Sequence, residues 1–234
     1  MPLPRLLLPA VTAAVLALAG CSGPTSPGAS GGTAPASSTS EPAAARAAAE
    51  AEAAADPATA GDPAQAALAL ALRTGDLPAG WSVQANPLAA GADLADNPSL
   101  GGICGYAFAS EAHRTTKHPV VGVDADGTAQ VSAEAIAYDS AAAAATAVQE
   151  LVQAFGTCPP EDYTFEPGPD AEGLAADSVV VQYRLADGST QVVVAQARGE
   201  VLSVLIGADP ATTAAAARSI AVRIAALPAA AIGG

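Results

Sequence analysis

The pattern of hydrophobic and polar positions in residues 62–234 predicts three helices, of which the first is short. In the stretch DPAQAALALALRTGD, Asp62 is a natural N-cap, Pro63 suits the first helical turn and Gly75 supplies a stop. The residues expected to face the core are Leu68, Ala71 and Leu72.

Two longer helices are predicted further along the chain. The stretch SAAAAATAVQELVQAFGTCPP repeats its apolar residues at i, i+3, i+4 and i+7 and ends at Gly156. The last helix, DPATTAAAARSIAVRIAAL, begins with Asp209 as N-cap and Pro210 in the first turn. The expected buried residues are Val148, Leu151, Val152 and Phe155 in the former and Ile220, Ile224 and Leu227 in the latter.

Strands are predicted where apolar and polar residues alternate or where β-branched residues form short runs. WSVQA follows the turn DLPAGW, and VVGVDADGTAQVSAEAIAYD reads as a hairpin because Asp126 and Gly127 form a strong turn dipeptide. Near the C-terminus, SVVVQYRL, TQVVVAQA and EVLSVLIG are separated by short turns, so we expect them to pair as antiparallel neighbours.

The remaining segments are predicted loops: residues 86–103, the polar residues 109–118, and a stretch rich in Pro, Asp and Glu after Cys158. The order is helix, strand, hairpin, helix, three-stranded meander and helix. This order predicts an α+β fold, a twisted antiparallel β-sheet packed by three helices, in a single domain.

The first twenty residues have the character of a secretory signal peptide. Arg5 is the only charge before an apolar run that ends near Ala19, and the run is short for a membrane-spanning helix. Leu18, Ala19, Gly20 and Cys21 resemble the bacterial lipobox, in which the cysteine is lipid-modified and becomes the first residue of the mature protein. We therefore predict a signal peptide over residues 1–20 and lipidation of Cys21.

Two other interpretations of this N-terminus are open. It could be an ordinary signal peptide in which Cys21 is accidental, or an uncleaved membrane anchor. The shortness of the apolar run and the absence of a basic stop-transfer cluster argue against the anchor.

Residues 21–61 change composition to Ala, Gly, Ser, Pro and Thr. After Cys21 they contain no Leu, Ile, Val, Phe, Tyr or Trp. Such a segment cannot bury enough apolar surface to offset the entropy of ordering it. We expect a lipid-anchored, disordered tether that carries the domain of residues 62–234.

The predicted domain is strongly acidic. It holds seven Arg and Lys against nineteen Asp and Glu, a net charge of −12. This charge argues against nucleic acid as a partner and against flat adsorption to anionic lipid. Small molecules or envelope proteins remain as expected partners, with the membrane reached through the lipid on Cys21.

Cys104 and Cys158 are the two cysteines of the domain. In an exported protein a disulfide between them is the default expectation. The alternatives are a metal site, for which there is no Cys-x-x-Cys spacing, or a catalytic thiol. The sequence predicts no metal and no cofactor.

The motif LALRTGDLPAGWSV resembles the opening motif of the PknH-like extracellular sensor-domain family, found in actinobacterial lipoproteins and outside receptor kinases. Cys104, the hairpin, the Ala-rich helix running into FGTCPP, and the final meander and helix match that layout over about residues 66–228. The resemblance implies a twisted antiparallel sheet with flanking helices and a groove for an extracellular ligand. The kinase sensor domain in that family has two disulfides, whereas this chain can form one.

Several patterns could carry chemistry. GASGG (residues 28–32) fits the Gly-x-Ser-x-Gly hydrolase pattern but lies in the tether, and DADG (residues 124–127) lacks the remaining ligands of an EF-hand. The other candidates are an acidic cluster (Glu161, Asp162, Glu166, Asp170 and Glu172) and a basic island (His113, Arg114, Lys117 and His118) that could contact an anion. Trp81, Tyr106, Phe108, Tyr138 and Phe155 are expected in the core rather than on a ligand platform.

No catalytic set emerges from these patterns, so we expect a non-catalytic binding or sensor module at the outer face of the cell membrane. Its ligand and ligand-binding residues are unknown at this stage. Two alternatives remain: a structural or chaperone-like partner of another envelope protein, and a surface hydrolase that would depend on the two histidines.

Overall fold

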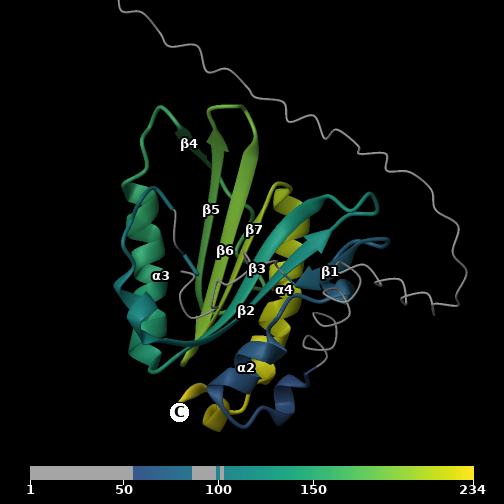
Figure 1. Ribbon diagram of the computed structural model, residues 1–234, viewed down its shortest axis with the longest axis vertical. Coiled ribbons are helices and arrows are strands. Elements are labelled where there is room, and N and C mark those ends of the chain that lie inside the picture. The colour runs from purple at the N-terminus through teal and green to yellow at the C-terminus, as the bar shows by residue number, and fades with distance from the viewer. Residues whose placement is uncertain (1–54, 86–98, 101–102) are drawn as a thin grey trace, which may run out of the picture. The chain divides into compact units, whose positions relative to one another are not determined.

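One antiparallel sheet of seven strands organises the protein, in the order β1-β2-β3-β7-β6-β5-β4 (Figure 1). The structure is a computed structural model that describes residues 55–85, 99–100 and 103–234. The strands are β1 (Ser82–Ala85), β2 (Arg114–Val123), β3 (Ala129–Tyr138), β4 (Tyr163–Glu166), β5 (Asp177–Leu185), β6 (Thr190–Arg198) and β7 (Val201–Gly207).

Each α-helix begins where the sequence places an N-cap. Asp62, Ser140 and Asp209 each accept a hydrogen bond from the backbone N–H three residues further along, which satisfies one of the free donors of the first turn. The α-helices are α2 (Pro63–Ala69), α3 (Ala141–Gly156) and α4 (Pro210–Ala226), and the short 3₁₀ helices are η1 (Pro57–Thr59), η2 (Thr74–Asp76), η3 (Ala109–His113) and η4 (Ala229–Ile232).

The helices cover opposite faces of the sheet (Figure 1). Successive side chains of a strand point to opposite faces, so Val192 and Val194 of β6 join the core under α2 and α4, whereas Val193 and Ala195 join the core under α3. The middle strands therefore bury apolar side chains on both faces. The expected α+β class, a single antiparallel sheet with three helices, is confirmed.

The first helix is shorter than its hydrophobic pattern predicts. α2 ends at Ala69, Leu68 is only half-buried, and Leu70 is in the core instead. Asp76 accepts a hydrogen bond from the backbone N–H of Arg73, and its carboxylate is held by Arg223 of α4 at 2.7 and 2.8 Å. This contact with a distant helix fixes residues 70–76 in a turn.

The buried face of α3 differs from the expected stripe of large apolar residues. Val152 is 50% exposed and Val148 half-buried, while alanines such as Ala147 and Ala154 line the sheet beside Leu151 and Phe155. Small side chains let the helix approach the sheet closely, so the alanine face is the one that packs.

Two segments expected as loops contain strands. Residues 114–118 begin β2, although they are polar, because they pair with β3 as far as Tyr138. Residues 163–166, in the acidic and proline-rich stretch, form the edge strand β4, which pairs with β5 from Gln182 to Leu185. Prolines and acidic residues on both sides of this short strand give the stretch the composition of a loop.

Residues 55–61, at the end of the segment expected as tether, have defined structure. Asp56 caps η1 through the backbone N–H of Ala58, and Ala60 is buried in the core under α2 and α4. Arg73 donates a hydrogen bond to the carbonyl of Ala55. The packed domain therefore includes residues before Asp62.

Gly199 lies in the turn between β6 and β7, where the backbone conformation and the close approach of η4 leave no room for a side chain. Its φ of 57° lies in the left-handed region, and a Cβ there would lie 2.1 Å from the carbonyl oxygen of Ile232. We predict that Gly199→Ala lowers the free energy of unfolding by about 2–4 kcal/mol, from backbone strain and displacement of η4. Gly75→Ala is the control, because a Cβ at Gly75 meets nothing within 4 Å. Urea denaturation of both variants checks this, and equal stabilities would contradict it.

Candidate functional site

The N-terminal features lie outside the described residues. Cys21, the signal peptide, the GASGG stretch and residues 21–54 of the expected tether belong to this part of the chain. In the part that the structure does describe, no helix has the length and hydropathy of a membrane span.

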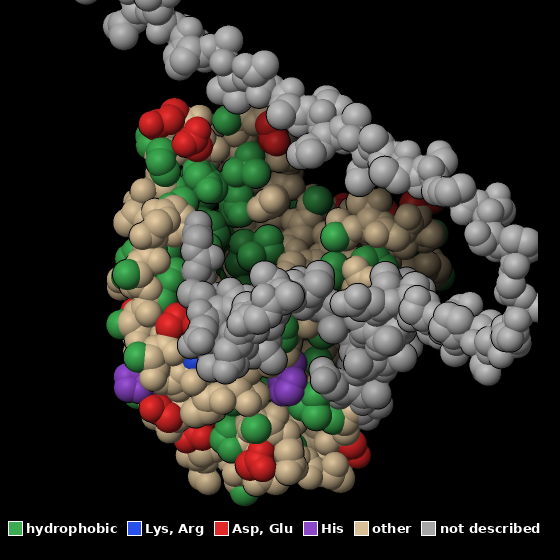
Figure 2. Space-filling view, viewed as in Figure 1, with side chains coloured by type: hydrophobic (Ala, Val, Ile, Leu, Met, Phe, Trp, Pro, Cys, Tyr) green, Lys and Arg blue, Asp and Glu red, His purple; other side chains and the backbone are tan. Residues whose placement is uncertain are grey.

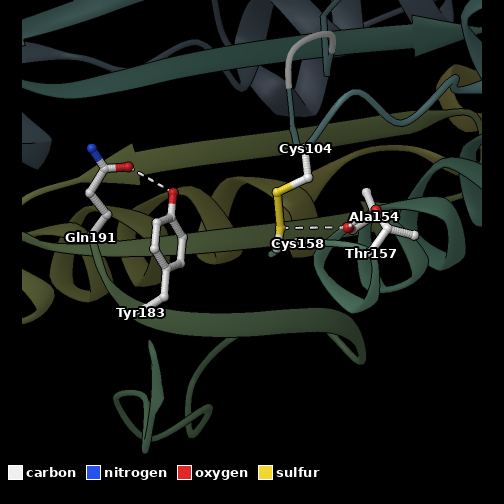
Figure 3. The surroundings of a disulfide bond; sticks show 6 residues. All are labelled: Cys104, Ala154, Thr157, Cys158, Tyr183 and Gln191. Atoms are coloured by element: carbon white, nitrogen blue, oxygen red, sulfur yellow. Dashed lines mark hydrogen bonds between the residues drawn. A yellow bond between two sulfur atoms is a disulfide. The ribbon is translucent and has the colours of Figure 1, made fainter. Parts of the chain in front are cut away.

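Cys104 and Cys158 are joined by a disulfide, the pair expected from the sequence (Figure 3). Cys158 follows the end of α3, where its sulfur lies 3.6 Å from the carbonyl oxygen of Ala154, and the two Cα atoms are 5.1 Å apart. The bond ties the segment that precedes η3 to the end of α3. For a sequence separation of 54 between the cysteines, the chain-entropy model gives a stabilisation of about 4 kcal/mol.

A row of side chains crosses five strands on the face that carries α3. Directly paired residues of antiparallel strands point to the same face, and here Val121 pairs with Ser132, Ser132 with Ile206, Ile206 with Val193, and Val193 with Val181. Ser132, Ile206 and Val181 are only half-buried, so α3 leaves this row partly uncovered. We call this row, with the cavity above it, the sheet groove.

The sheet groove contains a cavity of about 380 Å³. Its size is in the range of small-molecule sites. The cavity is lined by Val121, Ala129, Gln130, Val131, Ser132, Gln191, Ile206, Gly207 and Ala208. These described lining residues are mostly apolar, with two side-chain amides and one hydroxyl, and none of them has a titratable side chain.

Tyr183 fixes the orientation of the Gln191 amide. The Tyr183 hydroxyl donates to Oε1 of Gln191 at 2.7 Å, and Figure 3 shows the amide nitrogen pointing away from the tyrosine. Burial, reinforced by the neighbouring Tyr163, raises the pKa of Tyr183 to about 12, so the phenol stays protonated and acts as the donor. The amide nitrogen makes no hydrogen bond to the described residues and can donate to a ligand.

Asp124 fixes the other amide in the opposite sense. Nε2 of Gln130 donates to Oδ2 of Asp124 at 2.6 Å, which leaves the side-chain oxygen Oε1 of Gln130 as an acceptor. Hydrogen bonds from the backbone of Thr128 and from Gln130 lower the pKa of Asp124, so its carboxylate is charged at neutral pH. The cavity therefore offers one oriented donor, one oriented acceptor and the Ser132 hydroxyl.

This arrangement suits an uncharged ligand that has an apolar body and both hydrogen-bond donors and acceptors. None of the lining residues that the structure describes carries a charge to pair with an ion. Sequence reasoning missed Gln130, Gln191 and Tyr183, although a polar residue within an otherwise apolar strand was a signal available in TQVVVAQA.

The basic island expected at residues 113–118 does not exist as a cluster. Lys117 and His118 are neighbours on β2, so they point to opposite faces, with Lys117 opposite Ile136 and His118 opposite Ala135. Figure 2 shows the two histidines as separate purple patches. These side chains are separated because residues 114–118 form a strand, in which successive side chains point to opposite faces, and not a loop.

Acidic partners hold the cations of this segment. The Lys117 side chain is fully buried, and its Nζ lies 3.5 Å from Oε1 of Glu134. Nε of Arg114 donates to Glu111 at 3.0 Å. Burial raises the pKa of Glu134, although Lys117 acts in the opposite direction. These charges are therefore part of the packing between β2, β3 and η3.

His113 forms an exposed pair with Asp139. Its Nδ1 lies 2.8 Å from Oδ2 of Asp139, which lowers the pKa of that carboxyl. Ser140 donates to the other oxygen of Asp139 at 3.1 Å and also caps α3, so it lies on the carboxylate side of the pair. A Ser-His-Asp triad requires the hydroxyl on the far ring nitrogen, and among the described residues no hydroxyl bonds to it.

Two of the acidic candidates, Glu166 and Asp124, have local partners. Glu166 pairs with Arg184 across β4 and β5, and Asp124 is occupied by the hairpin turn. Within residues 55–85, 99–100 and 103–234, no three His, Cys, Asp or Glu side chains are grouped so that they could hold a metal ion.

An aromatic cluster lies beside the disulfide. Phe155 of α3, Tyr163 and Phe165 of β4 and Tyr183 of β5 have ring centroids 5.3 to 6.3 Å apart in four pairs. Phe155 is buried as expected, but Phe165 is 48% exposed. Figure 2 shows hydrophobic side chains gathered where β5 and β6 lie.

The other aromatic residues expected in the core differ in their burial. Phe108 and Tyr138 are buried, and Trp81 and Tyr106 are half-buried.

Comparisons with known proteins identify no family. No protein-family model matches the chain, and no curated protein matches it. Among solved structures the chain is similar to the crystal structure of the extracellular domain of PknH from Mycobacterium tuberculosis, with 14% sequence identity and a TM-score of 0.36 over 62% of this chain and 75% of that one. Values this low do not place the chain in the family of that protein.

The ion pair between Lys117 and Glu134 is buried on the lysine side, so removing one partner alone should strongly destabilise the folded protein. We predict that Lys117→Met lowers the free energy of unfolding by about 3–5 kcal/mol, because Glu134 is left without its counter-charge, and that Lys117→Met with Glu134→Leu recovers most of the loss. The pKa of Glu134 is raised on folding, so the single variant should lose stability as pH rises above the ordinary glutamate value of 4.5. Chemical denaturation between pH 4 and 8 measures this. A double variant as unstable as the single one would contradict it.

Proposed function

We propose that this protein is a lipid-anchored, non-catalytic binding module on the outer face of the cell membrane, and that its sheet groove takes a small uncharged ligand. The observation that carries the ligand class is the pair of amides whose orientations are fixed by Tyr183 and Asp124. Groups that are already oriented before a ligand arrives lose little freedom on binding, which favours recognition.

The absence of a charged group in the groove supports binding over catalysis. General acid–base and nucleophilic catalysis need a group with a matched pKa within hydrogen-bond reach of the substrate. In the part of the chain that the structure describes, the cavity lining provides the hydroxyl of Ser132 but no base beside it. The pair of His113 and Asp139 lies outside this lining.

The location rests on the sequence and on the disulfide. The lipobox-like Leu18, Ala19, Gly20 and Cys21 follow an apolar run, and a disulfide persists in oxidising compartments outside the cytosol. An anchor at Cys21 would leave Cys104 and Cys158 free to pair with each other, as they do.

A retained ligand should depend on the groove. We predict that native mass spectrometry of the protein purified from its own envelope finds a bound neutral small molecule, and that Ile206→Glu abolishes its retention by placing a charge in the apolar floor. Val152→Glu is the matched control, because Val152 is an exposed valine on α3 outside the cavity lining.

Retention of the ligand by Ile206→Glu would contradict the proposal that the sheet groove is its binding site.

Cross-linking of the same envelope preparation separates the alternative functions. A stoichiometric protein adduct without a small molecule would favour a structural partner. Loss of a measured hydrolase activity in His113→Ala would favour an enzyme.

The anchor has its own test. We predict that metabolic labelling with a radioactive fatty acid marks the wild type but not Cys21→Ala, because the thiol is the acceptor of the lipid. The Cys104→Ala and Cys158→Ala double variant controls for labelling of other cysteines and should keep the label. Label that remains on Cys21→Ala would refute the lipid anchor.

A further inference from the structure

A second and larger hollow lies on the opposite face of the sheet, between α4 and the segment that leads into β5. Its volume is about 610 Å³. Its lining includes Leu174 and Asp177, Arg198 of β6, and Val222, Ile224 and Ala225 of α4. The sheet groove shares none of these residues, so the two hollows are separate.

Hydrogen bonds hold the wall of this hollow in place. Arg218 of α4 donates to the carbonyls of Glu172 and Asp170 at 2.8 and 3.0 Å. The fully buried Gln196 accepts from the backbone N–H of Ala175 at 3.0 Å and donates to the carbonyl of Ala217 at 2.8 Å. Residues 170–175 are thereby fastened to α4 and β6, so the hollow is preformed.

The interior of the hollow is apolar and open. Alanines, Leu174 and Ile224 form most of it, and Val222 at the rim is 72% exposed, the highest value among the exposed large hydrophobic residues described. An alkyl chain lying against these side chains would remove apolar surface from water, at about 0.8 kcal/mol for each buried methylene.

Among the described lining residues, Arg198 is the one cation. Its Nη1 donates to the carbonyls of Ile224, Ala225 and Leu227 at 2.7, 3.2 and 3.0 Å, at the end of α4. Nε and Nη2 make no hydrogen bond to the described residues, so these donors can take both oxygens of a carboxylate. Asp177 does not oppose this, because it pairs with Ala197 and so points to the other face of the sheet.

We propose that this hollow binds an unbranched alkyl carboxylate, with the carboxylate on Arg198 and the alkyl chain along Leu174 and Val222. The available Nε and Nη2 donors of Arg198 select an acid, because among the described lining residues the other charged side chain, Asp177, points to the opposite face of the sheet. The site is independent of the ligand proposed for the sheet groove.

Isothermal titration with dodecanoate tests the proposal. We expect a Kd below about 1 mM for the wild type, and at least tenfold weaker binding of dodecanol and dodecyltrimethylammonium, which lack the anionic head. Absence of binding, or equal binding of the ammonium compound, would overturn the proposal. This comparison uses only the wild-type protein, so no folding defect can affect it.

Two alanines at the end of α4 give a matched pair of variants. Ala225 and Ala226 are adjacent and exposed, but only Ala225 lines the hollow. We expect Ala225→Trp to fill the hollow and weaken dodecanoate binding at least tenfold, and Ala226→Trp to bind as the wild type does. Ile206→Glu, in the sheet groove, should also bind normally. Equal affinity of the two tryptophan variants would overturn the assignment of the site.

Discussion

The antiparallel pairing of β3 with β7 joins the two halves of the sheet, and the rest of the structure depends on its register. Seven residue pairs run from Val131 with Gly207 to Ala137 with Val201, between segments that are distant in the sequence. A slip of one residue would turn Ser132 and Glu134 into the core under α2 and α4 and move buried valines and alanines to the other face. The two apolar faces of these strands therefore select one register, and that register builds the row of the sheet groove.

The two faces of the sheet differ in what their helices leave uncovered. On one face α3 packs through alanines, and the amides of Gln130 and Gln191 border the cavity beyond it. On the other face α4 and residues 173–177 enclose an apolar hollow with Arg198 at its edge. One sheet therefore borders two hollows, one edged by the amide of Gln191 and the other by the guanidinium of Arg198, because alternate residues of β6 point to opposite faces.

The segment before β2 is held against α3 by groups that the helix itself provides. The disulfide fixes Cys104 to Cys158, and the buried Glu150 accepts the backbone N–H groups of Ala109 and Ser110 at 2.8 and 3.1 Å. A buried carboxylate is tolerated at Glu150 because both donors are directed at it. These contacts place η3 at the start of β2 and so position the buried pair of Lys117 and Glu134.

The sequence by itself determined the elements with strong local signals: the N-capped helices, the hairpin at Asp126 and Gly127, the C-terminal meander and hence the α+β class. It also indicated the pairing of Cys104 with Cys158, because a disulfide is the default for two cysteines in a domain that the sequence predicts to be exported. Only the tertiary structure decided the short first helix, the exposed Val152, the edge strand β4 and both hollows. Each of these depends on contacts between residues far apart in the chain, such as Asp76 with Arg223 or Arg218 with the carbonyl of Glu172, and local periodicity carries no information about such contacts.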